Sequence, residues 1–369
     1  MIHRTDVFVI GGGPAGLAAA IAARLRGFDV IVADPAQPPI EKACGEGLMP
    51  NSLRTLERLG VEIGAEDSFP FRGIRFVDEG SSVAANFPAG SGVGIRRIRL
   101  HRCLIDRARD LGVRLLWGVR VTGIRDGCAS VWGREISCRW VVGADGQNSR
   151  VRCWAGLESA RSESYRFGFR RHYRVRPWSD YTEIYWGAEY QVYVTPVGPE
   201  EVSVALLTRD AHRRLDNVLP CFPELHPRLA GAFLVSSERG AISASRRLGK
   251  VYHGSTVLIG DASGSVDAIT GEGLCLSFQQ GIALADALLT GDLRAYESAH
   301  RRLARRPVFM EHLMLSLDRS NWLRHRVIPA LCSKPEIFAN LLAMHVGELS
   351  FTSFVSGAML PLGWRMLTA

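Results

Sequence analysis

The sequence has few lysines and many arginines. Lysine occurs only at Lys42, Lys250 and Lys334, so nearly all of the 45 basic residues are arginine. A net charge of +8 invites a nucleic-acid partner, but the arginine clusters lie in periodic segments typical of solvated helix faces. We therefore expect no nucleic acid to bind. The clusters are at residues 96–99, 213–214, 301–302 and 305–306.

Paired cysteines and long apolar runs are also lacking. The eight cysteines show no CxxC spacing, which argues against a zinc site or a disulfide framework and favours a reduced, cytoplasmic setting with no metal. The chain enters its first strand with no room for a signal peptide, and no run of eighteen apolar residues is present. The apolar segment 327–367 is either a packed helical tail, a cover for a lipophilic substrate, or a peripheral membrane contact.

The first fifty residues indicate a βαβ unit. Residues 6–10 predict a buried strand, residues 14–27 an alanine-rich helix, and residues 29–33 a second strand that ends at Asp34. Asp34 follows the start of the first helix by about twenty residues, the sequence spacing at which an acidic residue binds a ribose hydroxyl of a dinucleotide.

A glycine loop joins this first strand to its helix. Gly11, Gly13 and Gly16 form a GxGxxG pattern with Pro14 at the helix start. Such glycines turn tightly, admit a pyrophosphate to the backbone and let the helix meet the strand. The loop alone predicts a dinucleotide site and is compatible with either NAD or FAD.

The rest of the chain alternates between two kinds of pattern. Residues 113–142 predict a strand and a meander that lead back to the nucleotide unit, whereas residues 165–207 have the period of two of an antiparallel sheet. A buried strand at 257–259 and a helix at 273–289 follow, and the remainder is helical. We expect an FAD-binding domain at 1–75, 95–160 and 245–300, a substrate domain at 76–94 and 161–244, and C-terminal helices at 301–369.

Two blocks far downstream select FAD. They are Gly143-Ala144-Asp145-Gly146 and Gly260-Asp261-Ala262, the latter followed by Gly271-Glu272-Gly273. With the glycine loop they resemble, over roughly residues 5–300, the flavin-dependent family typified by para-hydroxybenzoate hydroxylase. That family includes aromatic hydroxylases, halogenases and, as relatives, geranylgeranyl reductases. The resemblance implies an α/β fold with a Rossmann-type FAD-binding domain, an inserted antiparallel-sheet substrate domain and a C-terminal helical segment.

The resemblance also implies roles for individual residues. Asp145 would support the nucleotide, Asp261 would bind the ribityl chain, and Arg97, in a segment similar to the family's RxxLxxxL, would approach FAD. The helix that begins near Gly273 would aim free N–H groups at the flavin N1 and O2 edge. The predicted FAD-binding residues are Gly11, Gly13, Pro14, Ala15, Gly16, Asp34, Lys42, Arg97, Val121, Asp145, Gly260, Asp261, Gly271, Gly273 and Leu274.

Two segments depart from the hydroxylase pattern, and the first is Lys42-Ala43-Cys44-Gly45-Glu46. It resembles the Lys-x-Cys-Gly-Gly of geranylgeranyl reductases, in which a cysteine beside the flavin would donate a proton or tune access to its reactive face. Glu46 is unusual in that pattern. It would act as a general acid or base if desolvated near the flavin, or else face water.

The second departure is the strand that contains Tyr193. Residues 191–196 (QVYVTP) retain only an aromatic residue and the proline of the reductases' YxWxFP, which disfavours an isoprenoid reductase. Alternation places Gln191, Tyr193 and Thr195 on one face, which in the family looks toward substrate and flavin, so Tyr193 is a predicted substrate contact. A WxWxIP signature is absent, which argues against halogenation.

These patterns favour an FAD-dependent monooxygenase of secondary metabolism. NAD(P)H would reduce the flavin transiently, and a C4a-hydroperoxide would hydroxylate a phenolic or polyketide-like apolar small molecule. The first alternative is a flavin-dependent reductase of an isoprenoid or lipid double bond, suggested by residues 42–47 and the apolar tail. The second is a non-catalytic electron-transfer protein that binds FAD. Nothing in the sequence specifies an oligomeric state.

Overall fold

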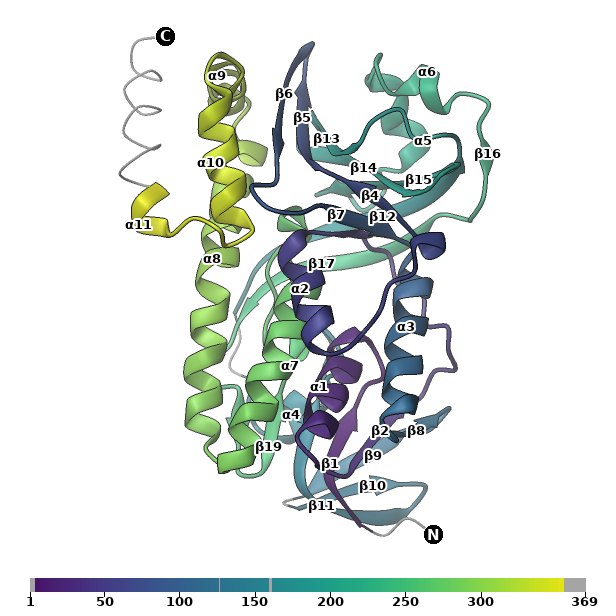
Figure 1. The fold of residues 1–369 in the computed structure, drawn as a ribbon, viewed down its shortest axis with the longest axis vertical. Coiled ribbons are helices and arrows are strands. Elements are labelled where there is room, and N and C mark those ends of the chain that lie inside the picture. The colour runs from purple at the N-terminus through teal and green to yellow at the C-terminus, as the bar shows by residue number, and fades with distance from the viewer. Residues whose placement is uncertain (1–3, 126, 159–160, 355–369) are drawn as a thin grey trace.

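The computed structural model describes residues 4–125, 127–158 and 161–354, which form two large sheets, a small sheet and a set of long helices (Figure 1). The sheet that contains β1 lies at one end of the molecule, and the sheet that contains β14 lies at the other. The long helix α8 (Leu293–Arg319) runs along one side and spans the distance between them.

The first sheet is the predicted nucleotide-binding sheet. β1 (Arg4–Ile10) is central and pairs in parallel with β2 (Val30–Asp34) and β11 (Arg134–Gly143). Both faces of these strands are buried: helices cover one face, and the predicted meander, with residues such as Val121 and Ala129, packs on the other. α1 (Pro14–Leu25) packs against α7 (Gly273–Thr290) and α3 (Arg97–Asp110). The other strands are β8 (Arg114–Trp117), β9 (Val121–Arg125), β10 (Cys128–Val131), β18 (Tyr252–His253) and β19 (Thr256–Leu258).

The second sheet is mainly antiparallel, as the period of two predicts. Its order is β16-β12-β15-β14-β13-β5-β6, with β17 paired to β12. One face carries a core that includes Val192, Val204 and Leu206, over which short helices close. Its strands are β5 (Gly73–Asp78), β6 (Ser81–Asn86), β12 (Arg161–Arg174), β13 (Tyr181–Gly187), β14 (Tyr190–Gly198), β15 (Glu201–Thr208), β16 (Phe233–Leu234) and β17 (Arg239–Arg247). The short helices are α5 (Leu215–Val218), η2 (Leu219–Cys221) and α6 (His226–Leu229).

A small sheet lies where the two large ones meet. In it β7 (Gly92–Ile95) pairs with β3 (Gly47–Leu48) and β4 (Ser68–Phe71), beside α2 (Pro50–Arg58) and η1 (Ala65–Asp67). β7 also packs tightly on β14, because a Cβ at Gly94 would stand 1.7 Å from the carbonyl oxygen of Pro196. Glycine is therefore required at this crossing.

The C-terminal helices continue directly from the nucleotide domain. α7 ends at Gly291, whose φ of +75° suits glycine, and Asp292 then caps α8 by accepting the backbone N–H groups of Arg294 and Ala295. The expected domain boundary after residue 300 thus falls inside α8. Three more helices follow up to residue 354, where the described part of the chain ends: α9 (Asn321–Ser333), α10 (Pro335–His345) and α11 (Phe351–Phe354).

α9 and α10 pack against the edge of the second sheet at β6. Phe76, Val83, Ile328 and Phe338 share one buried cluster there, which explains the apolar composition of this segment. Within the described residues no single helix has the length and apolarity to cross a membrane; α9 and α10 meet that test only together, bent by 105°. Residues 355–367 of the predicted apolar segment lie outside the described part of the chain.

Candidate active site

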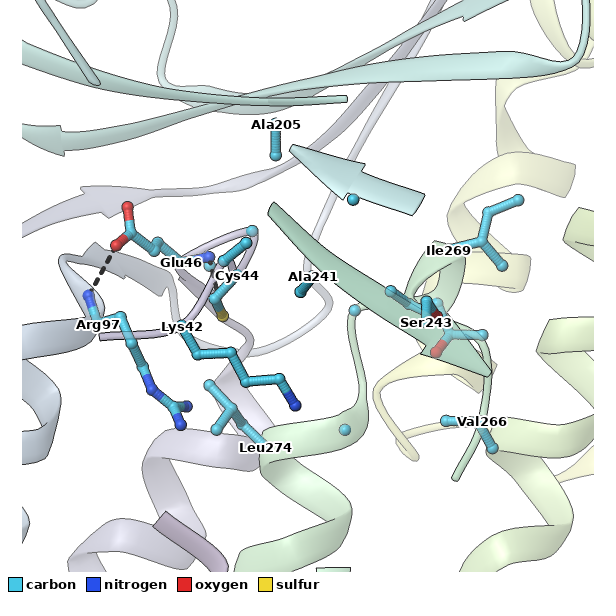
Figure 2. A pocket seen from close by; sticks show the side chains of 18 of the residues that line it. Lys42, Cys44, Glu46, Arg97, Ala205, Ala241, Ser243, Val266, Ile269 and Leu274 are labelled. Carbon is cyan, nitrogen blue, oxygen red and sulfur yellow. Dashed lines mark hydrogen bonds between the residues drawn. The ribbon is translucent and has the colours of Figure 1, made fainter. Parts of the chain in front are cut away.

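One cavity of about 540 Å³ extends from the glycine loop to α10. Its lining changes character along its length: backbone and charged groups lie at the glycine-loop end, and apolar side chains lie at the other. Figure 2 shows the region between, where Lys42, Cys44, Glu46 and Arg97 lie on one side and Ser243, Val266 and Ile269 on the other.

The need for glycine at the three loop positions has two different structural causes. A Cβ at Gly16 would stand 1.9 Å from the carbonyl oxygen of Gly11, and one at Gly11 would stand 2.4 Å from that of Ala144. These two glycines allow backbone segments to pack closely. A Cβ at Gly13 would meet no protein atom within 4 Å, so this glycine keeps open space beside the N-terminus of α1. Ala15 also lines the cavity, near N–H groups that the first helical turn leaves free.

Two carboxylates hold the loops at this end. Asp34 accepts hydrogen bonds from the N–H of Gly12 at 2.7 Å and of Ala36 at 2.8 Å. Asp145 accepts from the Ser149 hydroxyl at 2.5 Å and from the N–H of Arg150 at 2.7 Å, at the start of α4 (Arg150–Trp154). Both residues also line the cavity, where their remaining lone pairs suit ribose hydroxyls.

The next section of the cavity has the chemistry expected around a flavin. Asp261 lies in η3 (Gly260–Ser263), and Lys42 donates to it at 3.1 Å. η4 (Ala268–Thr270) leads through Gly271, with φ of +67°, into α7. No side chain caps α7, and Gly273 and Leu274 in its first turn line the cavity. The positive end of this helix would therefore face an anionic reduced flavin bound in this part of the cavity.

The residues present fit FAD. The Nε atom of Arg97 is buried without a hydrogen-bond partner, and Arg97 lines the cavity. Gly271 and Gly273, like Gly13, have no protein atom within 4 Å of the Cβ that another residue would carry. An unpaired buried donor and backbone held clear of side chains are what a polar, close-packed ligand requires.

Glu46 and Cys44 lie together in the segment before β3. Glu46 is only 3% exposed and adopts a φ of +59°, a conformation that its glycine counterpart in reductases takes without strain. Its N–H points to the Sγ of Cys44 at 3.5 Å, its Oε1 accepts the N–H of Arg97 at 2.8 Å, and its Oε2 lies 2.6 Å from Nε2 of His172. Glu46 thus fixes the position of the Cys44 segment against α3 and β12.

Electrostatics favour the ionised form of Glu46. Burial by itself would raise the pKa of Glu46, but the hydrogen bond from His172 and the charge of the Arg170 guanidinium lower it below its ordinary value. Arg170 contacts Nδ1 of His172 at 2.8 Å, and because arginine only donates, the His172 proton belongs on Nε2 facing Glu46. An anion held in this way is suited to positioning rather than to proton donation.

Tyr193 lies farther along the cavity, on β14. Its hydroxyl donates to the carbonyl oxygen of Ile269 at 3.0 Å, and burial raises its pKa above the ordinary value, so the phenol stays neutral. Tyr193 and Thr195 line the cavity, as alternation predicts. Gln191, on the same face, instead contacts Arg166 and Asp318 in a fully buried polar cluster.

Three predicted cofactor residues do not line the cavity. Val121 packs in the core of the nucleotide sheet with Val119 and Ala129, and its role toward FAD stays a prediction. Gly16 acts through the close approach described above. Gly260, with φ of +59°, donates its N–H to the Gln280 side chain at 2.8 Å and thereby sets the turn that carries Asp261.

Sequence reasoning missed several lining residues. Arg170, which lines the cavity, and His172, which contacts Glu46, lie two positions apart on one buried face of β12, and that spacing was a usable signal. The apolar end gave no such signal, because its residues come from separated segments. They are Met49, Phe71, Phe76, Ile184, Met310, Met314, Phe338, Leu341 and Leu342, and His345 lies among them.

Comparison with known proteins agrees with this geometry. A family described as FAD binding domain matches residues 4–300. A menaquinone reductase of Mycolicibacterium smegmatis is 30% identical over 330 residues, covering 81% of this chain and 80% of that protein. A digeranylgeranylglycerophospholipid reductase of Methanothermobacter thermautotrophicus is 28% identical over 342 residues, covering 84% of each.

The fold recurs among solved structures. A flavoprotein/dehydrogenase from Cytophaga hutchinsonii has a TM-score of 0.86 at 20% identity, over 99% of both chains. At that identity the likeness concerns the fold alone, and it includes the C-terminal helices as well as the two sheets. The chain therefore belongs to the FAD binding domain family, and it is an FAD-dependent oxidoreductase.

Proposed function

We propose that this protein is a reductase that uses FAD to saturate a carbon–carbon double bond in an apolar, isoprenoid-type chain. The observation that carries the proposal is the continuity of the cavity, which joins the FAD end to a chamber walled by aromatic, leucine and methionine side chains. Apolar chains gain about 25 cal/mol for each Å² of surface removed from water. A lipid chain therefore suits this chamber better than a small polar substrate.

The named relatives support the same substrate class. Menaquinone and digeranylgeranylglycerophospholipid, the compounds in the names of the two reductases, are both lipids with polyprenyl chains. Sequence reasoning placed this activity second, mainly because residues 191–196 lack the reductase pattern. Most of the chamber is built from other segments, namely α8, α10 and the strands around β5. The mismatch of residues 191–196 with the reductase pattern is therefore weaker evidence against a reductase.

The chain's own residues would bind the substrate and exclude water. Phe338, Leu341 and Leu342 on α10 and Met310 and Met314 on α8 form the wall that a lipid would contact. Bound FAD, reduced by NAD(P)H, would supply the hydride. Methionine side chains adapt easily in shape and suit a flexible chain.

Cys44 retains a proposed role at the flavin end. Its thiol lines the cavity beside Lys42, held by the Glu46 backbone and by the ion pair between Lys42 and Asp261. We assign it to shaping access to the reactive face of the flavin. Replacement by alanine would then alter substrate selectivity while FAD binding persists.

A hydroxylase remains the second candidate, because Gln191-Val192-Tyr193-Val194-Thr195-Pro196 does not match the reductases. The two reactions leave different products: saturation adds two hydrogen atoms to the substrate, and hydroxylation adds one oxygen atom.

Product analysis tests the proposal. FAD-loaded protein is reduced without oxygen, mixed with a menaquinone that carries four prenyl units, and the extract is aerated before mass spectrometry. Aeration returns any quinol to quinone, so a lasting gain of two mass units marks chain saturation. An unchanged mass would contradict the proposal, and a gain of sixteen units with oxygen and a phenol would establish the hydroxylase.

A further inference from the structure

A buried polar group lies at the boundary between the flavin end and the apolar chamber. It consists of Glu272 at the start of α7, Arg306 on α8 and His345, the last residue of α10. Arg306 donates to Oε1 of Glu272 at 3.0 Å, and Nδ1 of His345 lies 3.5 Å from Oε2 of Glu272. Glu272 is 1% exposed and His345 is 6% exposed, and His345 lines the cavity.

His345 and Glu272 face each other without a hydrogen bond between them. The His345 ring hydrogen-bonds the backbone of Thr270, which places its single proton there in the neutral form. Its Nδ1 lone pair then faces a carboxylate oxygen, and both atoms are buried without a hydrogen-bond partner. Two facing acceptors are unfavourable, and an unpaired buried polar group costs about 1–3 kcal/mol. A proton on Nδ1 would turn this repulsion into an attraction across the 3.5 Å contact.

The position of this pair links it to the redox state of the flavin. Glu272 lies between Gly271 and Gly273, both of which line the cavity, and the N1 and O2 edge of a bound flavin would lie beside them. Two charged groups act on the ring of His345, the Glu272 carboxylate and the Arg306 guanidinium. Burial lowers the pKa of His345 below its usual range, Glu272 opposes this shift, and Arg306 reinforces it. Negative charge on a reduced flavin would add to the effect of Glu272 and favour the imidazolium.

We propose that His345, held by Glu272, takes up a proton when bound FAD is reduced and supplies that proton to the substrate double bond. The second half of this statement rests on the proposed reductase function. Saturation breaks the π bond and forms two C–H bonds. The hydride comes from reduced flavin and the proton from His345, which returns to neutral imidazole. His345 stands next to Leu341 and Leu342 in the chamber wall, where the substrate chain would lie.

The first test measures the flavin midpoint potential against pH in the FAD-loaded protein and in His345→Gln. One additional proton for every two electrons adds about 30 mV per pH unit to the slope. We expect the wild type to be steeper than His345→Gln by this amount in part of the range between pH 5 and pH 8, about the range in which histidine titrates. Equal slopes throughout would overturn the proposal.

A second variant and a control show whether a shallower slope in His345→Gln comes from the lost proton or from a folding defect. Glu272→Gln can donate an amide N–H to Nδ1, satisfying both atoms without a proton, so it should show the shallower slope as well. His325→Gln, an exposed residue on α9 that contacts Glu79, should keep the wild-type slope. A shallower slope in the control would contradict the assignment to His345.

The substrate half is tested by anaerobic single turnover with the prenylated quinone. His345→Gln should be reduced normally and should then saturate the chain about 100-fold more slowly, the range expected for a lost general acid. An unchanged rate would overturn His345 as the proton source. No saturation by the wild type would instead refute the reductase function, and the slope difference would show whether proton uptake stands without it.

Discussion

At the FAD end of the cavity most contacts come from backbone groups in short glycine-containing loops, whereas at the apolar end they come from side chains on several separate elements. Gly11, Gly13 and Gly271 act through what they lack, a Cβ, and each lies within a motif of a few residues. Phe76, Met310 and Phe338 act through shape, and more than 200 positions separate the first from the others along the chain.

The two ends therefore have different sensitivities. A backbone cradle is intolerant of added atoms, because a Cβ would either meet fixed backbone, as at Gly16, or fill space that a ligand needs, as at Gly13. An apolar wall tolerates exchange of one side chain for another of similar volume. A single substitution at a glycine of the FAD end should therefore abolish or strongly weaken cofactor binding. A single substitution in the apolar wall should change substrate preference only slightly.

The largest expected effect separates two glycines of the same loop. Gly16→Ala should abolish FAD binding and lower the melting temperature of the FAD-free protein, because its Cβ would clash with the Gly11 carbonyl 1.9 Å away. Gly13→Ala should weaken FAD binding while the FAD-free protein melts normally, because that Cβ would meet no protein atom. Flavin absorbance after gel filtration and thermal melts of stripped protein measure both.

The apolar end should respond in the opposite manner. Phe338 packs against Phe76 with ring centroids 4.7 Å apart, so Phe338→Ala should lower the free energy of unfolding by about 3–5 kcal/mol and raise the KM for the lipid substrate. FAD occupancy at 20 °C should remain full. Leu289→Ala, at a position 56% exposed on α7, is the matched control and should change neither quantity. Loss of FAD from Phe338→Ala would erase the distinction between the two ends.

Glu46 lies where the two ends meet, and its effect should depend on pH. Its folded pKa is lowered from 4.5, so the stability that it contributes is present above about pH 4.5 and is lost as the pH falls through the folded value. Near pH 7, Glu46→Gln should cost about 3 kcal/mol, because it leaves buried Arg170 and His172 with a weaker partner. Urea unfolding at pH 7 and pH 4 checks this. A difference that grew on acidification would reverse the assigned sign.

The smallest effect concerns Tyr193. Tyr193→Phe removes one hydrogen bond to the Ile269 carbonyl and should lower the free energy of unfolding by about 1 kcal/mol. Because its phenol stays neutral and serves as a wall and an anchor for η4, kcat should change less than about tenfold. Steady-state kinetics with the lipid substrate decide this. A fall of 100-fold or more would make Tyr193 a proton donor and displace His345.

The sequence was sufficient to predict FAD as the cofactor, because the motifs that indicate FAD are local. Gly11, Asp145, Asp261 and Gly273 lie in segments whose spacing is set by one turn or one helix start, so a pattern of a few residues reports the geometry. The inserted sheet was equally predictable, since a period of two places alternate side chains on one face. Val121 carries no such local pattern, and its side chain lies in the core, so its contact with FAD stays a prediction.

The apolar end could not be predicted because it depends on how separate elements pack. An apolar residue in a helix looks the same whether it faces a core or a substrate, so Leu341 and Phe338 gave no indication of their place. Nothing in the sequence indicated a role for His345 either, since its partners Glu272 and Arg306 are 73 and 39 positions away. Glu46 was identified as unusual, but its buried contact with His172 on β12, 126 positions away, could not be predicted from the sequence.

The central claim is that the apolar chamber and the FAD end form a single site for reduction of a lipid chain. Anaerobic stopped-flow absorbance tests it most directly. Reduced FAD-loaded protein is mixed with geranylgeraniol in one experiment and with its fully saturated counterpart in another. Oxidised flavin should reappear with the unsaturated alcohol alone, and the product should be two mass units heavier than geranylgeraniol. Flavin that stays reduced with both alcohols, or is reoxidised equally by both, would contradict it.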